Sequence, residues 1–363
     1  MSIALVGGAR PNFMKIVPIV RQLEKRGLPY KLIHTGQHYD YNMSKIFFEQ
    51  LSLPEPDYYL GVGSGTHTFQ TAKAMLELEK AYGEIQPDLV VVVGDVNSTL
   101  AGALAAVKSG IPAAHVEAGL RSFDRTMPEE INRLLTDAIC DLLFTTCEDA
   151  DINLRKEGVP EEKIHFVGNT MIDTLIGLMG EIDKSTIVKD LGLQEGRYVY
   201  ITLHRPSNVD DPNKLSAIAE ALNDISDKGL KMVFPLHPRT RQSMEDFNLS
   251  KEFVAIPGLL MTDPVSYNDS IALARSAAVV LTDSGGLQEE TTFLGVPCLT
   301  LRPNTERPVT ITKGTNTLLD EGPAMIPAEI EKVLRGEIKR GMAPALWDGK
   351  AAERIAAIIE GCP

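Results

Sequence analysis

The chain has 363 residues, of which 44% are hydrophobic and 23% are charged, and its formal net charge is −13. This length and composition are typical of a globular protein with about two domains. The acidic balance argues against nucleic acid as a partner, because an acidic surface repels phosphate. The first residues lack the basic and apolar regions of a signal peptide, and the longest strongly apolar run, 89–93, is too short to cross a membrane.

In the first half, apolar runs of strand length alternate with longer helical patterns. The strands are predicted at 3–6, 31–34, 88–93, 113–116 and 142–145, and helices at 11–26 and 99–108. The run 88–93 is rich in β-branched residues, as expected for a strand buried on both faces. This alternation predicts a parallel sheet with crossover helices.

The same alternation restarts after about residue 170. Strands are predicted at 198–203, 231–235, 253–256, 278–282 and 298–301, and helices at 213–227, 264–276, 286–294 and 351–359. We therefore expect an α/β protein of two facing Rossmann-like, doubly wound parallel-sheet domains, 1–168 and 169–345, with a segment 346–363 that packs back on the first. Because ligands of such sheets bind at the carboxyl ends of the strands, we expect an active-site cleft between the domains.

The first strand is followed by a glycine-containing turn that leads into a helix. Its residues are Gly7-Gly8-Ala9-Arg10-Pro11-Asn12, and Lys15 lies one turn later. Such a turn can hold an anion through its backbone N–H groups, the helix dipole and the two cations. The third glycine of a GxGxxG motif is missing, so a dinucleotide cofactor is not expected.

Carboxylates follow other strands of the first half. Asp95 follows 88–93 after Gly94, Glu117 ends the strand that contains His115, and Glu129 is the second residue of the segment Pro128-Glu129-Glu130. Pro followed by two Glu residues is also an ordinary helix start. A carboxylate at a buried strand end is costly unless it is paired, solvated or functional, and proton abstraction needs such groups. Arg121 and Arg133 are the accompanying candidates for substrate binding.

Cations and a second glycine turn mark the strand ends of the second half. His204 and Arg205 end one strand, His237 ends the next, and Ser284-Gly285-Gly286 starts a helix after 278–282. A Ser-Gly-Gly helix start offers a hydroxyl and unobstructed N–H donors to a phosphate. Glu290 lies where a carboxylate could accept two ribose hydroxyls, and Arg307 follows the next strand.

The remaining patterns favour no metal or cofactor. Asp149-Ala150-Asp151 resembles a metal motif of sugar transferases, but it begins a polar helix, as does the pair Asp210-Asp211. The four cysteines are scattered without CxxC spacing, which is typical of free thiols in a reducing cytoplasm.

Taken together, the motifs resemble the non-hydrolysing UDP-N-acetylglucosamine 2-epimerase family, whose fold is similar to that of GT-B glycosyltransferases. The matching blocks occur in order from residue 8 to residue 316: GARPNFMK, HTGQHYD, VVVGDVNST, HVEAGLRS, PEEINR, TLHRPSN, HPRT, TDSGGLQEE, NTERP and KGTN. The resemblance implies a cytoplasmic homodimer that interconverts UDP-N-acetylglucosamine and UDP-N-acetylmannosamine through a glycal intermediate. It further implies catalytic roles for Asp95, Glu117, Glu129 and His204.

The chain departs from the family pattern at several positions. Pro206 and Ser207 replace an arginine and a glutamate, Ser270 replaces an aromatic residue, and Tyr39 stands beside Gln37 and His38 where arginine is common in a regulatory site. The phrase RSFDRTMPEE also resembles relatives that act on UDP-2,3-diacetamido-uronic acids, so such a sugar nucleotide is a second possible substrate. The motifs are also compatible with a GT-B glycosyltransferase, a hydrolysing epimerase or a nucleotide-sugar sensor, and product analysis separates these functions.

Overall fold

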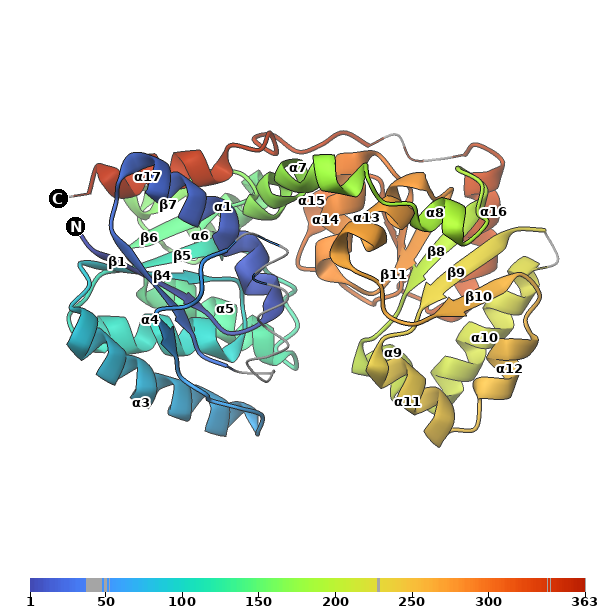
Figure 1. The fold of residues 1–363 in the computed structure, drawn as a ribbon, viewed down its shortest axis with the longest axis horizontal. Helices are drawn as coiled ribbons and strands as arrows, with labels where there is room; N and C mark the ends of the chain where they lie inside the picture. The colour runs from blue at the N-terminus through green and yellow to red at the C-terminus, as the bar shows by residue number, and fades with distance from the viewer. Residues whose placement is uncertain are drawn as a thin grey trace. The chain divides into compact units, whose positions relative to one another are not determined.

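The computed structural model describes residues 1–36, 48, 51, 53–226, 229–337, 339 and 341–362. They form two compact units (Figure 1), which we call the first unit (Met1–Ile176 with Ala345–Pro363) and the second unit (Gly177–Pro344). The division falls inside helix α7 (Thr170–Ile182). Among the helices described here, none is long and apolar enough to cross a membrane.

Within the described residues, the first unit is built on a seven-stranded parallel sheet of order β3-β2-β1-β4-β5-β6-β7. Its strands are β1 (Ile3–Gly7), β2 (Tyr30–His34), β3 (Tyr58–Tyr59), β4 (Leu89–Val93), β5 (Ala113–Ala118), β6 (Leu142–Thr145) and β7 (Ile164–Phe166). Its other elements are α1 (Arg10–Arg26), α3 (His67–Ile85), α4 (Asn97–Lys108), α5 (Pro128–Ile139), α6 (Glu148–Lys156), η1 (Glu161–Lys163), the first part of α7, and α17 (Ala351–Glu360).

Helices cover both faces of this sheet, and the central strands are accordingly apolar. Every residue of β1, β4 and β5 is buried, which explains the nearly continuous hydrophobic runs in the sequence. Figure 1 shows α1 and α17 on one side of the sheet and α3 and α4 on the other. Helix α17 packs against α1, and its first two N–H groups are accepted by the Asp173 carboxylate, at 3.2 Å from Ala351 and 2.7 Å from Ala352.

In its described part, the second unit contains a six-stranded parallel sheet of order β10-β9-β8-β11-β12-β13. Its strands are β8 (Tyr198–Thr202), β9 (Lys231–Pro235), β10 (Leu259–Thr262), β11 (Val279–Thr282), β12 (Cys298–Thr300) and β13 (Asn316–Leu318). Its other elements are α8 (Ile187–Asp190), α9 (Pro206–Val209), α10 (Pro212–Ser226), α11 (Pro238–Asp246), α12 (Ser250–Ala255), α13 (Tyr267–Ser276), α14 (Gly285–Leu294), α15 (Pro308–Thr312), η2 (Pro323–Met325) and α16 (Ile326–Leu334).

The predicted fold class of two Rossmann-like, parallel-sheet α/β halves is confirmed, and one predicted strand is wrong. The segment 253–256 belongs mainly to helix α12, and the strand follows it as β10. Phe253 and Ile256 are buried while the two residues between them are exposed. That spacing of three residues is helical, whereas a strand would alternate. Helix α3 is not among the predicted elements.

Candidate active site

Polar side chains gather at the carboxyl ends of three neighbouring strands of the first unit. The sheet pairs β4 with both β1 and β5, so the turns after these strands meet at one edge. The Asn12 side chain ties two of the turns together. Its Oδ1 accepts the N–H groups of Gly8 and Ala9 at 3.1 and 2.9 Å, and its Nδ2 donates to the Val93 carbonyl oxygen at 2.8 Å. Arg10 is exposed at the start of α1.

Lys15 and Glu117 form a buried ion pair at this edge. The Lys15 ammonium donates to Glu117 Oε2, and the two residues are 7% and 3% exposed. Burying two charges is expensive, and their close contact offsets part of that cost. Gly94 lies beside the pair, since a Cβ atom there would lie 3.4 Å from Lys15 Nζ. The structure thus brings together a cation from the first helix and a carboxylate from a strand 102 residues later.

Glu117 has an unusual backbone conformation. Its φ is 74°, in the left-handed region that residues with a Cβ rarely occupy. The pairing of β5 with β6 shifts register between Val116 and Ala118, so Glu117 forms a bulge. Such strain amounts to about 1–3 kcal/mol and is concentrated at functional sites. The bulge directs the Glu117 side chain to Lys15.

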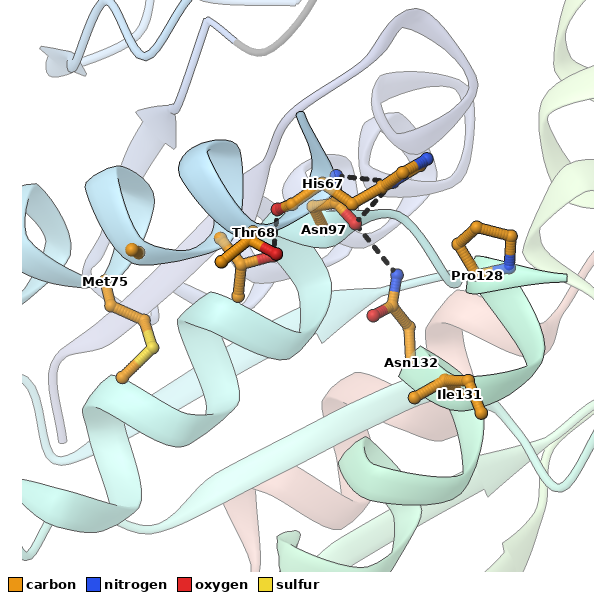
Figure 2. A pocket seen from close by; sticks show the side chains of 9 residues that line it. His67, Thr68, Met75, Asn97, Pro128, Ile131 and Asn132 are labelled. Carbon is orange, nitrogen blue, oxygen red and sulfur yellow. Dashed lines mark hydrogen bonds between the residues drawn. The ribbon is translucent and has the colours of Figure 1, made fainter. Parts of the chain in front are cut away.

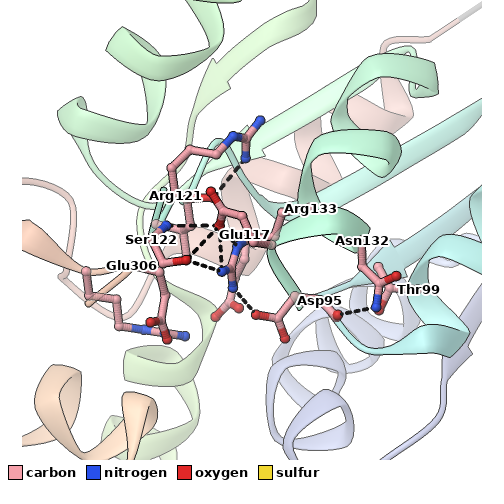
Figure 3. Close-up of polar contacts among 12 residues, drawn as sticks. Asp95, Thr99, Glu117, Arg121, Ser122, Asn132, Arg133 and Glu306 are labelled. Atoms are coloured by element: carbon pink, nitrogen blue, oxygen red, sulfur yellow. Dashed lines mark hydrogen bonds and ion pairs between the residues drawn. The ribbon is translucent and has the colours of Figure 1, made fainter. Parts of the chain in front are cut away.

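Arg133 holds two carboxylates of the first unit (Figure 3). It donates to Asp95, whose side chain is 29% exposed, and to Glu130 Oε2 at 2.7 Å. Glu130 also accepts the N–H groups of Ser122 and Phe123, each at 2.9 Å. Burial would raise the pKa of Glu130, but these N–H groups and the Arg133 charge hold the pKa below its usual value. Glu129 is half-buried in the first turn of α5.

The sequence predicts that Arg121 binds substrate, but the structure gives its guanidinium internal partners. The residue is 1% exposed, and its side chain donates to Glu157 at 2.8 and 2.6 Å. Asp137 Oδ2 lies 2.7 Å from its NH1 atom. Arg133 is equally enclosed, with 2% exposure. Both arginines therefore hold carboxylates of the first unit.

A cavity of about 440 Å³ lies next to Asp95, among α3, α4 and α5. Its lining residues are His67, Thr68, Thr71, Ala72, Met75, Asn97, Pro128, Ile131 and Asn132. Figure 2 shows Asn97 between His67 and Asn132. Asn132 Nδ2 in turn donates to the Asp95 carbonyl oxygen at 2.9 Å. The polar side of the cavity thus supports the turn that carries Asp95.

In the second unit, a buried aspartate organises the ends of β8 and β11. The Asp283 carboxylate accepts the N–H groups of His204 and Arg205, at 3.0 and 2.9 Å for its Oδ2 atom. Its Oδ1 atom also lies 3.0 Å from His204 Nδ1. Burial would raise the pKa of Asp283, but His204 and these N–H groups hold the pKa below its usual value. Asp283 is not among the predicted site residues, although its place before Ser284 is a usable signal.

The two histidines of the second unit lie side by side. The ring centroids of His204 and His237 are 5.3 Å apart. His237 Nδ1 accepts the Arg239 N–H at 3.2 Å, at the start of α11. Burial, His204 and Arg239 lower the pKa of His237. This arrangement fixes the His237 Nδ1 atom as an acceptor, while the His204 Nδ1–H group donates a hydrogen bond to the Asp283 carboxylate.

Arg307 lies against the N-terminus of α14. A Cβ atom at Gly285 would lie 2.8 Å from its NH1 atom, so a side chain there would displace the guanidinium. Arg307 is 6% exposed and pairs with Glu306 and, at 2.9 Å, with Glu289. Ser284, Gly285 and Gly286 are half-buried at this helix start. The structure therefore places the predicted glycine turn, Ser284-Gly285-Gly286, in contact with the predicted Arg307.

Glu290 lies one turn further along α14 and is buried. The Tyr267 hydroxyl donates to its Oε1 at 2.7 Å. Burial raises the pKa of Glu290 to about 7, with a further contribution from Glu289 that the Tyr267 hydrogen bond partly offsets. Ser270 is hydrogen-bonded to the Tyr200 hydroxyl at 2.8 Å.

Two further sequence predictions concern a regulatory segment and metal ions. Gln37, His38 and Tyr39 lie outside the described residues. Within the part of the chain that is described, there is no group of three or more His, Cys, Asp or Glu side chains that could hold a metal ion.

Comparison with known proteins assigns the chain to a family. The model of the UDP-N-acetylglucosamine 2-epimerase family matches residues 21–360. The chain is 44% identical to UDP-N-acetylglucosamine 2-epimerase of Methanocaldococcus jannaschii, over 99% of both sequences. It is 43% identical to UDP-2,3-diacetamido-2,3-dideoxy-D-glucuronate 2-epimerase of Pseudomonas aeruginosa, over 98% of both sequences.

A solved structure shows the same fold. The crystal structure of the M. jannaschii UDP-GlcNAc 2-epimerase in complex with UDP-GlcNAc and UDP matches with a TM-score of 0.91, covering 99% of each chain. Fold, motif order and sequence identity over nearly the whole length agree. The chain belongs to the UDP-N-acetylglucosamine 2-epimerase family.

Proposed function

We propose that this chain inverts the configuration at C2 of UDP-N-acetylglucosamine to give UDP-N-acetylmannosamine, without hydrolysis. One observation carries the proposal: the Glu117 carboxylate, paired with Lys15, is held on a backbone bulge at the carboxyl end of β5. The family model that covers this segment is that of an epimerase. A strained carboxylate beside a buried cation is suited to proton transfer and anion binding.

The chemistry of the sugar determines the order of the bond changes. The C2 hydrogen of a pyranose is not acidic, because no carbonyl group flanks it. We propose that the C1–O bond breaks first and its electron pair leaves with UDP. A base then takes the C2 proton, and the C2–H electron pair forms the C1=C2 bond of a 2-acetamidoglucal. Protonation of the opposite face of C2 and return of the UDP oxygen to C1 complete the inversion.

Each candidate residue is assigned one role in the proposed reaction. Asp95, Glu117 and Glu129, all in the first unit, are assigned to proton transfer and to stabilisation of the cationic transition state. Glu290 is assigned to the ribose hydroxyls. Arg121 and Arg133 are assigned to holding the carboxylates, because both guanidinium groups are buried against acidic partners.

The leaving diphosphate needs positive charge and N–H donors, which stabilise developing negative charge by several kcal/mol, about 2.7–4 for a well-placed donor. The second unit supplies most of them. The groups assigned to the diphosphate are Arg10, Lys15, His204, Arg205, His237, Ser284, Gly285, Gly286 and Arg307. Exclusion of water from these groups would protect the glycal.

Solvent-proton exchange tests the proposal. Incubation with UDP-N-acetylglucosamine in D₂O is expected to give UDP-N-acetylmannosamine and to place deuterium at C2, both detected by NMR. Glu117→Gln is expected to abolish the exchange while UDP affinity stays nearly unchanged, with the exposed Glu162→Gln as control. Failure of both products to appear overturns the proposal. A large loss of UDP affinity in Glu117→Gln would remove Glu117 from the catalytic role.

UDP-2,3-diacetamido-D-glucuronate is the second candidate substrate, favoured by the 43% identity to the P. aeruginosa enzyme. The chain matches that enzyme almost as well as it matches the M. jannaschii acetylglucosamine epimerase. The same D₂O experiment, run with each sugar nucleotide at equal concentration, decides between them. The substrate with the larger kcat/KM is the one assigned.

We also propose a cytoplasmic homodimer that supplies an activated sugar for surface polysaccharide. No disulfide joins Cys140, Cys147, Cys298 and Cys362, which suits a reducing compartment. Apolar side chains stand exposed on α3 and α5, namely Phe69, Leu76 and Leu135, as expected for a subunit contact. Light scattering after size exclusion should give the mass of two chains, and the mass of one chain would contradict the dimer.

A further inference from the structure

His115 lies two residues before Glu117 on β5, and its ring is completely buried. Its Nδ1 atom is 2.6 Å from Asp137 Oδ1, and its Nε2 atom is 2.7 Å from the Gly94 carbonyl oxygen. A carbonyl oxygen only accepts, and so does an ionised carboxylate. If the Asp137 carboxylate is ionised, both ring nitrogens must therefore carry a proton for the two hydrogen bonds to exist.

Asp137 has contacts that fit the ionised form. Its Oδ2 atom accepts the Gly119 N–H at 3.0 Å and lies 2.7 Å from Arg121 NH1. Burial would raise the pKa of Asp137, but His115, Arg121 and the Gly119 N–H together hold the pKa below its usual value. With His115 protonated on both nitrogens, the set of His115, Arg121, Asp137 and Glu157 contains two positive and two negative groups, so its charge is balanced.

The contacts of this set bracket the bulge at Glu117. Asp137 fixes the backbone at Gly119, two residues after Glu117, and the His115 ring fixes Gly94, the residue that follows the neighbouring strand β4. Gly94 also donates its N–H to the Val116 carbonyl oxygen at 3.0 Å. A Cβ atom at Gly119 would lie 2.5 Å from the Ala150 carbonyl oxygen, so the bulge has little room to relax. The strained φ of Glu117 is held from both sides.

We propose that His115 is a buried imidazolium and that His115, Asp137 and Arg121 are positioning residues that hold the Glu117 carboxylate in its reactive place. The kinetic part rests on the proposed function, whereas the charge of the ring does not. Misplacement of a catalytic group by about 1 Å can lower a rate about 100-fold. Loss of the set should therefore reduce turnover far more than binding.

The charge of the ring is tested on the unaltered protein. Histidine-selective ¹⁵N labelling and a long-range ¹H–¹⁵N spectrum at pH 7.5 report protonation of each ring nitrogen, and His115→Gln assigns the His115 signals by their loss. Both His115 nitrogens are expected at the protonated position. A spectrum with one nitrogen unprotonated overturns the proposed imidazolium.

The positioning role is tested with Asp137→Asn and His115→Gln. Each is expected to lower kcat about 100-fold, while KM and the Kd for UDP stay within about 3-fold. Asp141→Asn is the matched control, because Asp141 accepts the Ala113 N–H at 3.2 Å, at the opposite end of β5. A kcat for both variants within about 3-fold of the control, or an equal loss of UDP affinity, overturns the positioning role. If the unaltered enzyme inverts neither sugar, the proposed function and this kinetic part both fail, and the ring spectrum still decides the charge of His115.

Discussion

Glu290 shows how a single buried carboxyl group can make stability depend on pH. Its pKa is raised from 4.5 to about 7, chiefly by burial. Between these two values the folded protein binds the proton more tightly than the unfolded chain. The free energy of unfolding therefore falls as the pH rises through this window, by up to about 3 kcal/mol for a shift of this size.

Glu290→Gln should remove this dependence. The second unit of the variant is expected to gain stability over the unaltered protein as the pH rises from 5 to 8, because the amide carries no charge to bury. Thermal unfolding of both proteins at several pH values measures the difference. The exposed Glu220→Gln on α10 should show no such trend. If the stability difference between the two proteins stays constant with pH, the ionisation of Glu290 is not its cause.

For single residues, the sequence predicts which strand end carries a candidate side chain, but not which groups that side chain contacts. Strand ends identify Asp95, Glu117 and His204, because apolar runs mark strands and their carboxyl ends are easily read. The Lys15–Glu117 pair joins residues 102 positions apart, which no local pattern reveals. Arg121 is identified for the same reason as Asp95, yet its partners turn it inward.

At the scale of elements, the β5 bulge is the feature that local rules predict least well. Alternation and β-branching describe a regular strand, and Glu117 departs from it with a φ of 74°. Helix α12 escapes prediction for a related reason, since its short apolar segment suits either a strand or one face of a helix. The central strands are predictable from hydrophobic runs, whereas the edge strands β3, β7, β10 and β13, the bulge and the short helices depend on tertiary contacts.

The strain at Glu117 predicts that, at this position, the glycine variant is more stable than the alanine variant, which reverses their usual order of stability. Glu117→Gly is expected to be about 1 kcal/mol more stable than Glu117→Ala, because glycine occupies the left-handed region without a Cβ penalty. Both variants leave Lys15 without its carboxylate partner, so that loss cancels in the comparison. Chemical unfolding followed by fluorescence of Trp347, the single tryptophan, reports the first unit in which it is buried.

A control on the same strand gives the opposite sign. At Ala114, in the regular part of β5, replacement by glycine should lower stability. If Glu117→Ala is as stable as Glu117→Gly, or more stable, the bulge is unstrained.

For the whole molecule, the two units differ in how the chain forms them. The second unit is one continuous segment, whereas the first combines Met1–Ile176 with Ala345–Pro363. Trp347 donates its indole N–H to the Thr146 carbonyl oxygen at 2.9 Å, and Arg26 donates to Glu360 at 2.5 Å. The sequence predicts two halves and a segment 346–363 that returns to the first, but the individual partners of these contacts become visible only in the folded structure.

Ile355→Ala should weaken the first unit alone. Ile355 is fully buried on α17, which packs against α1, so a cost of about 2–5 kcal/mol is expected. Hydrogen exchange with mass spectrometry should show lost protection in α1 and β1 and unchanged protection in β11 and α14. The half-buried Ile358→Ala is the control and should have a smaller effect. Equal loss of protection in β11 would mean that the two units unfold together.

The division of the first unit between distant segments also affects its synthesis on the ribosome. Residues 177–344 are translated before α17. At about 5–20 residues per second, translation of this segment takes roughly ten to thirty seconds. During that time α1 lacks the helix that later covers it, while the second unit has its complete sequence first. The amino-terminal unit is therefore the last to be completed, and its nascent form is the one that offers an apolar helix face to chaperones.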